Sequence, residues 1–255
     1  MVVDGVYSAY ELGKAAFSVS RNGVLAWTAG RAGLAQLTWF DRKGNAAGTG
    51  GPSCTGEIAR LSPDERHVLL NTVAEHDGFA IVEQKGSGQV ALPGIRKPLW
   101  MADGLHILYA RKDGNIYRVV RRAIEGGAEQ ELARLPALSG LMDVSRDAKA
   151  LLYKQGQKLY SAWLSSTSMD GSPGIAQPQW VADSVQGRFS PDGRSVVYSA
   201  VTTGGRLDVF AQPFPLNGLR TQLTSEGGRD AVWRGDGKEI VYRKDKTLYL
   251  AAGGR

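Results

Sequence analysis

The stretch that decides the fold is RFSPDGRSVVYSA (Arg188–Ala200), in which a short polar turn separates two apolar runs. Pro191 presets the backbone for a tight turn, Asp192 accepts hydrogen bonds from the backbone N–H groups ahead of it, and Gly193 tolerates a positive φ. The stretch therefore predicts two antiparallel strands joined by a turn of two to four residues.

The same arrangement occurs six times along the chain. Successive turns are centred 39 to 45 residues apart, at Asn22, Asp64, Asp103, Asp147, Asp192 and Asp236. A period of about 40–45 residues with several strands in each unit is typical of the blades of a β-propeller. No unit carries a 3.6-residue apolar period, so a helical repeat is excluded.

Each unit continues with two further strands. A third strand carries an aromatic residue, and a fourth is more polar, as an outer edge strand requires. The third strands are predicted at Leu34–Asp41, Phe79–Gln84, Asn115–Val120, Lys158–Leu164, Leu207–Phe214 and Thr247–Ala252. Fourth strands are predicted at Gln89–Pro93, Glu129–Leu135 and Arg220–Thr224.

The sixth unit lacks a fourth strand. The residues that follow its turn and those that precede the first turn together make one period, so Val2–Val6 is predicted to complete the last blade. Closure of this kind removes the open edges of a row of sheets. We therefore predict an all-β fold, a six-bladed β-propeller of four-stranded antiparallel blades, as a single domain over residues 1–255. The domain is expected to be part of a longer chain.

Composition sets further limits. A chain of 255 residues with 42% hydrophobic residues can bury a sizeable core, and the single Cys54 excludes an internal disulfide. The net charge of +6 comes from scattered basic residues, so no nucleic-acid partner is expected. No apolar run reaches the length of a membrane span, and Asp4 and Glu11 interrupt any signal-peptide core. The compartment stays open.

The repeated pattern of an apolar residue, Ser-Pro-Asp-Gly and an apolar strand ending in Tyr resembles the TolB-type and WD-like six-bladed propellers. Gly23–Gly44, Asp208–Pro215 and Ala231–Arg243 resemble, more specifically, the C-terminal propeller region of bacterial transmembrane serine/threonine kinases. That resemblance implies a sensor or interaction domain outside the cytoplasm, although no kinase motif is present here. Departures from the pattern, expected to weaken single turns only, are Asn22, Met101, Arg234 and the Arg146–Ala148 turn.

Motifs of known chemistry are missing from the sequence. There is no G-x-S-x-G nucleophile elbow and no phosphate-binding glycine loop opening a helix. His67 and His106 occupy one repeat position in neighbouring units, where they would lie apart, and no third ligand has suitable spacing. The turn aspartates are spread one to a blade and act as turn formers rather than as a calcium site. No catalytic residue, metal site or cofactor is predicted, and the basic run Arg111–Arg122 is interpreted as a solvated strand and turn.

Candidate ligand-binding residues follow from the strand that leads into each turn, which lines the channel of a propeller. The residue three positions before the turn centre is apolar in all six units, so strand alternation places those four and six positions before it on the opposite face. The polar candidates there are Arg60, Lys97, Asp143, Gln186, Arg188 and Asp230. Both signs of charge occur, which suits a polar tunnel or a peptide-like ligand, and equally suits pairing of these side chains with one another.

The sequence thus favours a non-catalytic binding, scaffold or sensor domain that recognises a protein or peptide at one face or at the channel mouth, and that is monomeric in isolation. Two alternatives remain. One is a propeller hydrolase or lactonase with a metal in the channel, and the other is the regulatory gate of a larger peptidase or kinase.

Overall fold

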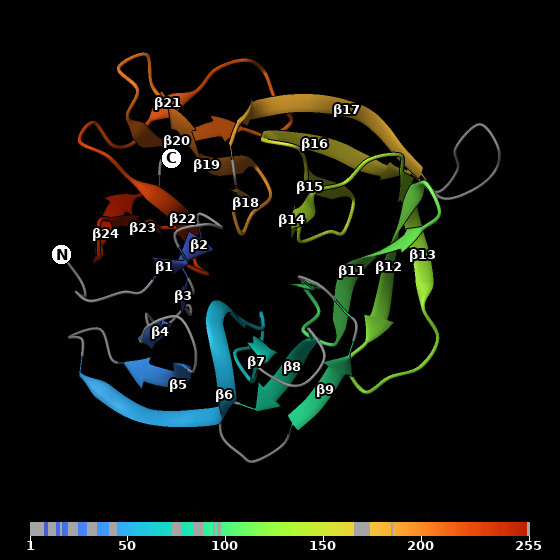
Figure 1. Cartoon of the computed structure of the whole chain (residues 1–255). Helices are drawn as coiled ribbons and strands as arrows, with labels where there is room; N and C mark the ends of the chain where they lie inside the picture. The colour runs from blue at the N-terminus through green and yellow to red at the C-terminus, as the bar shows by residue number, and fades with distance from the viewer. Residues whose placement is uncertain are drawn as a thin grey trace. The chain divides into compact units, whose positions relative to one another are not determined.

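The computed structural model describes residues 8–9, 14–15, 17–19, 25–29, 35–40, 45–72, 78–83, 89–93, 95, 98–165, 174–184 and 186–253. These residues form β-strands joined by turns (Figure 1). In this part of the chain no helix is long and apolar enough to cross a membrane. The chain divides into two compact units. Unit 1 comprises Met1–Gly94 with Glu226–Arg255, and unit 2 comprises Ile95–Ser225.

Unit 2 consists of three four-stranded antiparallel sheets, each with its strands in chain order. The first contains β10 (Leu99–Trp100), β11 (His106–Asp113), β12 (Ile116–Ala123) and β13 (Gln130–Leu135). The second contains β14 (Gly140–Val144), β15 (Ala150–Gln155), β16 (Lys158–Ser165) and β17 (Gly174–Asp183). The third contains β18 (Gly187–Phe189), β19 (Ser195–Val201), β20 (Leu207–Pro213) and β21 (Thr221–Gln222).

Two apolar clusters hold these three sheets together. Leu108 and Val119 of the first sheet pack with Leu151 and Tyr153 of the second, and all four are almost fully buried. The other face of the second sheet packs on the third through a matching cluster that contains Leu152, Leu159, Val196 and Tyr198. Because alternate residues of a strand point to opposite faces, β15 contributes to both clusters.

Unit 1 contains a two-stranded, a seven-stranded and a three-stranded sheet. The two-stranded sheet pairs β1 (Ser8–Ala9) with β2 (Lys14–Ala15). The seven-stranded sheet contains β3 (Phe17–Val19), β4 (Leu25–Ala29), β5 (Ala35–Phe40), β6 (Ala46–Leu61), β7 (His67–Thr72), β8 (Gly78–Glu83) and β9 (Gln89–Pro93). The three-stranded sheet contains β22 (Arg229–Trp233), β23 (Glu239–Lys244) and β24 (Thr247–Ala252).

The prediction of six separate four-stranded blades is wrong. Within the described residues, the sheets of three or more strands number five, because the first two sequence units share the seven-stranded sheet. Their connection is β6, one strand of 16 residues that curves along its length in Figure 1. Cys54 near its middle is the register partner of Ala35 in β5 and of Thr72 in β7. The outer strand of one unit therefore runs on as the inner strand of the next, through a glycine-rich middle that bends without ending the strand.

The last sheet has three strands in the described part of the chain. Val2–Val6, predicted to supply its fourth strand, lies outside the described residues. Closure of the ring by that segment, and the single domain over residues 1–255, therefore stay predictions.

The strand predictions within the units agree closely with the structure. The predicted strands Gln89–Pro93 and Thr247–Ala252 coincide with β9 and β24. The ends of the other predicted third and fourth strands differ by a few residues at most from those of β5, β8, β12, β13, β16 and β20. The predicted strand Arg220–Thr224 is shorter in the structure, where β21 has two residues. The apolar residue before each turn is buried between sheets in unit 2, as at Val144 and Phe189.

Candidate functional site

The described turns at Asp64, Asp147 and Asp192 share one hydrogen-bond network. In the turn between β18 and β19, the Ser190 hydroxyl donates to Asp192 Oδ1 at 2.5 Å, and the backbone N–H of Arg194 donates to the same oxygen at 3.0 Å. The Ser195 N–H in turn donates to Ser190 Oγ at 2.9 Å. Serine and aspartate thus fix the turn from both sides.

The turn between β14 and β15 repeats this network. Ser145 Oγ donates to Asp147 Oδ1 at 2.6 Å, and the Lys149 N–H donates to that oxygen at 3.1 Å. The glycine position is occupied by Ala148, which still adopts a φ of 56°. The left-handed conformation costs a residue with a side chain about 1–2 kcal/mol, so the network is strong enough to hold the turn without glycine.

These hydrogen bonds stabilise the ionised form of both carboxylates. The hydroxyl of Ser145 lowers the pKa of Asp147, and the hydroxyl of Ser190 lowers the pKa of Asp192, because each bond favours the charged form. Backbone N–H donors and nearby basic residues add to both shifts.

Two turns reach the same geometry without the serine. At Met101 the side chain cannot donate, and His106 Nδ1 contacts Asp103 Oδ2 at 2.7 Å instead. At Arg234 the guanidinium contacts both oxygens of Asp236, with Nε donating to Oδ1 at 2.8 Å and Nη2 donating to Oδ2. The departures at Met101 and Arg234 therefore leave these turns formed, with a cation of the chain itself on the carboxylate.

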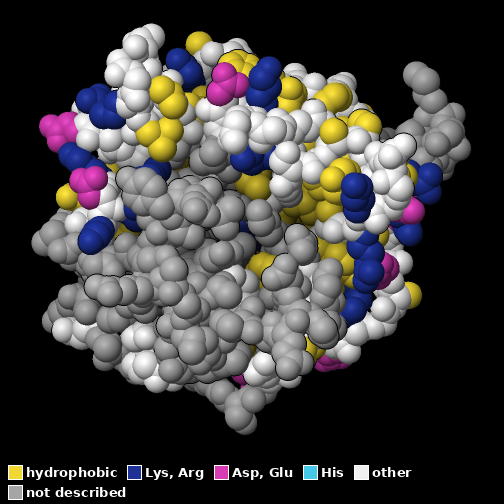
Figure 2. All heavy atoms as spheres, viewed as in Figure 1, with side chains coloured by type: hydrophobic (Ala, Val, Ile, Leu, Met, Phe, Trp, Pro, Cys, Tyr) yellow, Lys and Arg dark blue, Asp and Glu magenta, His cyan; other side chains and the backbone are white. Residues whose placement is uncertain are grey.

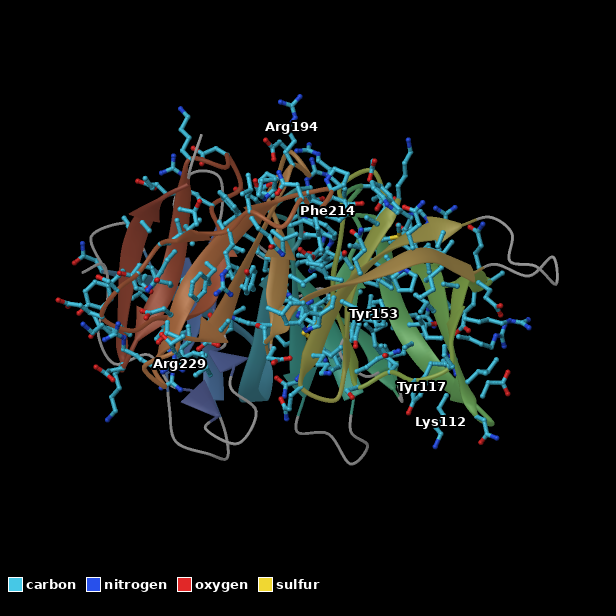
Figure 3. All side chains as sticks on the ribbon, turned by 90° about the horizontal axis from the view of Figure 1, so that it is seen from above. Lys112, Tyr117, Tyr153, Arg194, Phe214 and Arg229 are labelled. Atoms are coloured by element: carbon cyan, nitrogen blue, oxygen red, sulfur yellow. The ribbon has the colours of Figure 1, made fainter. Side chains whose placement is uncertain are left out.

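A pocket of about 370 Å³ opens between two of these turns in unit 2. Its residues come from the β14–β15 turn, from β16, from the β18–β19 turn and from the segment that follows β20. They are Ser145, Arg146, Asp147, Trp163, Pro191, Asp192, Gly193, Phe214 and Pro215. Figure 3 shows Phe214 and Arg194 toward one edge of the sheets of unit 2, with Lys112 and Tyr117 toward the opposite edge.

Aromatic rings form the apolar wall of this pocket. The Trp163 and Phe214 ring centroids are 5.1 Å apart at an interplanar angle of 43°, and Phe189 packs edge-on against Phe214 at 5.0 Å. The backbone N–H of Phe214 donates to the Arg194 carbonyl at 2.8 Å, which ties the segment after β20 to the β18–β19 turn. Trp163 and Phe214 remain half-buried, whereas Phe189 is buried. The wall therefore keeps ring surface available to a ligand.

The polar rim of the pocket carries charge of both signs. Oδ1 of Asp147 and of Asp192 is engaged in its turn, while neither Oδ2 has a hydrogen bond or ion pair to any described residue. Arg146 is exposed and makes no ion pair with the described part of the chain. The pocket thus combines an apolar wall with two carboxylates and one guanidinium.

Two of the predicted channel residues, Asp143 and Arg188, each hydrogen-bond to the backbone of the strand that carries the other. Asp143 in β14 accepts a hydrogen bond from the backbone N–H of Phe189 in β18 at 2.8 Å. Arg188 Nη1 donates to the Met142 carbonyl of β14 and, at 3.1 Å, to the Gly187 carbonyl. These bonds run from side chain to backbone and join the inner strands of the second and third sheets of unit 2. Pairing of the candidate side chains with one another stays a prediction.

Asp230 is held in a buried ion pair. It lies at a bulge of β22 with a φ of 59° and is 2% exposed. Arg243 of β23, also 2% exposed, donates from Nε to Asp230 Oδ2 at 2.9 Å, and its Nη2 lies 2.8 Å from the same oxygen. This pairing engages both charges within unit 1.

The remaining candidates lie at separate places. Arg60 is near the end of β6 and is partly buried, and Gln186 is buried just before β18, where its backbone N–H donates to Ser184 Oγ at 3.3 Å. Lys97 lies outside the described residues. Ligand binding by these six residues stays a prediction.

No three His, Cys, Asp or Glu side chains gather into a metal-binding cluster in the part of the chain that the structure describes. On the face seen in Figure 2, basic side chains are interspersed with acidic and apolar ones.

Sequence reasoning missed the pocket, because its wall comes from positions that do not repeat. Trp163 lies near the end of the third strand of the fourth unit, and Phe214 and Pro215 follow the third strand of the fifth. The Pro-Phe-Pro stretch at 213–215, found after no other third strand, was the one available signal.

Comparison with known proteins supports the fold. No protein-family model and no curated protein matches the chain. Among solved structures, TolB from Acinetobacter baumannii is similar at a TM-score of 0.53 with 14% identity, over 88% of this chain and 64% of that one. The β-propeller domain of Cps50 (Swd1) from Myceliophteria thermophila gives a TM-score of 0.60 with 11% identity, over 93% and 82%.

Oligogalacturonate lyase from Vibrio parahaemolyticus also gives a TM-score of 0.60, with 12% identity over 98% of this chain and 76% of that one. These likenesses, together with the succession of small antiparallel sheets, show that the chain has a β-propeller fold of the TolB-like and WD-like kind. The chain spans less than two thirds of the A. baumannii TolB. The finer resemblance to the propeller region of kinases has no support in these structures.

The turn network predicts a selective pKa change. In Ser190→Ala the hydroxyl donor is lost, so we expect the pKa of Asp192 to rise toward its ordinary value of 3.8 while the pKa of Asp147 stays lowered. A lowered carboxyl pKa stabilises the folded state above that ordinary value, and the stabilisation is lost as the pH falls through the folded-state pKa. The variant should therefore lose less stability on acidification. Carboxyl ¹³C NMR titration measures both groups, and Ser145→Ala should give the converse pattern.

The Asp230–Arg243 pair predicts a large stability loss on removal of one charge. Asp230→Asn keeps the shape of the side chain but leaves the Arg243 guanidinium buried and uncompensated, which typically costs about 3–5 kcal/mol. Urea unfolding measures this loss, and the double variant Asp230→Asn with Arg243→Met should regain part of it. An unfolding free energy equal to that of the unmodified chain would leave Asp230 available for a ligand instead.

Proposed function

We propose that this chain is a non-catalytic binding domain that recognises a protein or peptide partner, and that the partner docks in the pocket between the β14–β15 and β18–β19 turns. The pocket carries the proposal. In it, apolar surface and available ring faces come together, within one unit, with carboxylate Oδ2 atoms that have no hydrogen bond among the described residues.

The size and composition of the pocket support this function. A volume of about 370 Å³ falls at the lower end of the range for ligand sites, enough for one large side chain with its flanking backbone. Aromatic walls supply most of the affinity in such sites, and a few fixed polar groups set the orientation. Trp163, Phe214 and the two turn aspartates match that division.

The rigidity of the rim supports it further. Each turn is closed by its serine–aspartate network, and the Phe214 backbone is bonded to the β18–β19 turn. Binding to groups that are already ordered costs little conformational entropy. The propeller likeness to TolB and Swd1 agrees with an interaction domain.

A selection from a random peptide display library on the full chain tests the proposal. We expect recovered peptides to lose at least about tenfold in affinity for Trp163→Leu, because a central aromatic residue commonly contributes 2 kcal/mol or more to binding. The matched control is Trp180→Leu, which removes a tryptophan that is 54% exposed on the adjacent strand β17. Thermal unfolding confirms that both variants are folded. Recovery of no peptide, or an equal loss with Trp180→Leu, would refute the proposed site.

A second candidate function is enzymatic, favoured by the likeness to oligogalacturonate lyase over nearly the whole chain. In that case the predicted channel residues, or a metal held near them, would act on a sugar acid chain. A turnover assay of the full chain on oligogalacturonate, with and without divalent cations, decides between the two. We expect no product. Turnover that disappears in Asp143→Asn would favour the enzymatic function over the binding function.

A further inference from the structure

The pocket also indicates the chemical class of side chain that it takes. We propose, on the basis of the binding function above, that it receives an arginine side chain of the partner, with the guanidinium stacked on Trp163 and hydrogen-bonded to Asp147 and Asp192.

The acceptors for such a cation are two oxygens that the fold leaves available. In each turn Oδ1 takes the serine hydroxyl and a backbone N–H, and Oδ2 has no partner in the described part of the chain. Both carboxylates are ionised near neutral pH, because the ordinary aspartate pKa of 3.8 lies far below it and their hydrogen bonds lower the pKa further. The pocket lining includes these two aspartates and Arg146, and Lys149 and Arg194 lie near enough to lower the pKa of Asp147 and Asp192 without an ion pair to either carboxylate among the described residues.

The chain itself contains an example of the proposed contact. In the equivalent turn of the last sheet, Arg234 replaces the serine, and its guanidinium contacts both oxygens of Asp236. In the turn at Asp103, His106 occupies Oδ2. The turns that border the pocket carry serine at this position, so their Oδ2 atoms have no comparable internal cation. A guanidinium from a partner would make the Oδ2 part of the Arg234 contact from outside, because Oδ1 of Asp147 and of Asp192 already accepts the serine hydroxyl.

The aromatic wall favours arginine over lysine. A guanidinium is planar, weakly hydrated and able to stack on a ring while its N–H groups donate in its own plane. The half-buried Trp163 offers such a ring beside the two carboxylates. The lysine ammonium is a compact, strongly hydrated point charge that gains less from the same surroundings.

Defined peptides test this assignment. The probes are acetyl-Gly-Ser-Arg-Ser-Gly-amide and its lysine, citrulline and alanine counterparts, titrated into the full chain while the Trp163 indole N–H is followed by NMR. The signal is assigned by its loss in Trp163→Leu. Citrulline has the shape of arginine without its charge, so we expect its affinity to be at least about tenfold lower and that of lysine to lie between the two.

Paired variants separate the charge from the fold. Asp147→Asn with Asp192→Asn keeps an Oδ1 acceptor in each turn but removes the negative charge, so the advantage of arginine over citrulline should disappear. The matched control is Asp64→Asn, because Asp64 accepts the same bonds from Ser62 and from a backbone N–H in unit 1 but does not line the pocket. It should leave the titrations unchanged.

Two results would overturn the assignment. One is equal binding of the arginine and citrulline peptides, and the other is an equal loss in Asp64→Asn. If selected peptides still lose affinity in Trp163→Leu, the pocket remains a binding site with another preferred side chain. If no selected peptide responds to Trp163→Leu, the proposed function itself fails.

Discussion

The aspartate carboxylate at the centre of each described turn, from Asp64 to Asp236, is the constraint on which the strands joined there depend. The turn reverses the chain between the innermost strand and the second strand of a sheet. The carboxylate therefore has to accept hydrogen bonds from donors within the turn itself. A serine two residues earlier is such a donor at Asp64, Asp147 and Asp192. Where the serine is replaced, a histidine or an arginine of the chain takes over. The turn therefore has the same geometry in units of this chain that differ in sequence.

This arrangement has a consequence for the surface of unit 2. Where a serine donates to the turn aspartate, only Oδ1 accepts hydrogen bonds from described residues. Where an arginine donates, both carboxylate oxygens accept one. The two turns nearest Trp163 and Phe214 are of the serine type. Their charge therefore remains available beside an apolar wall, where a ligand cation would be partly removed from water and more strongly attracted than at an open surface.

Local chemistry explains how much of this was predictable from sequence. The alternating strands and the polar turns centred on Asn or Asp predicted most strands to within a few residues, since strand period and turn residues are properties of short segments. The merging of two units through β6 was not predictable, because it depends on the chain staying extended from Ala46 to Leu61. The pocket was missed for a similar reason. Its wall joins residues about 50 positions apart that have no counterparts in the other units.

The channel residues show why a polar pattern alone does not define a site. Asp143 and Arg188 were chosen by their position on the inner strands, and in the structure each bonds to backbone of the neighbouring sheet. Such bonds satisfy groups that would otherwise be buried without partners, so they stabilise the join between two sheets. At Asp147 and Asp192, in contrast, the hydrogen bonds of the turn use only one oxygen of each carboxylate and leave the other available. A polar atom that the fold does not use, next to ring surface that the core does not cover, is therefore the stronger sign of binding.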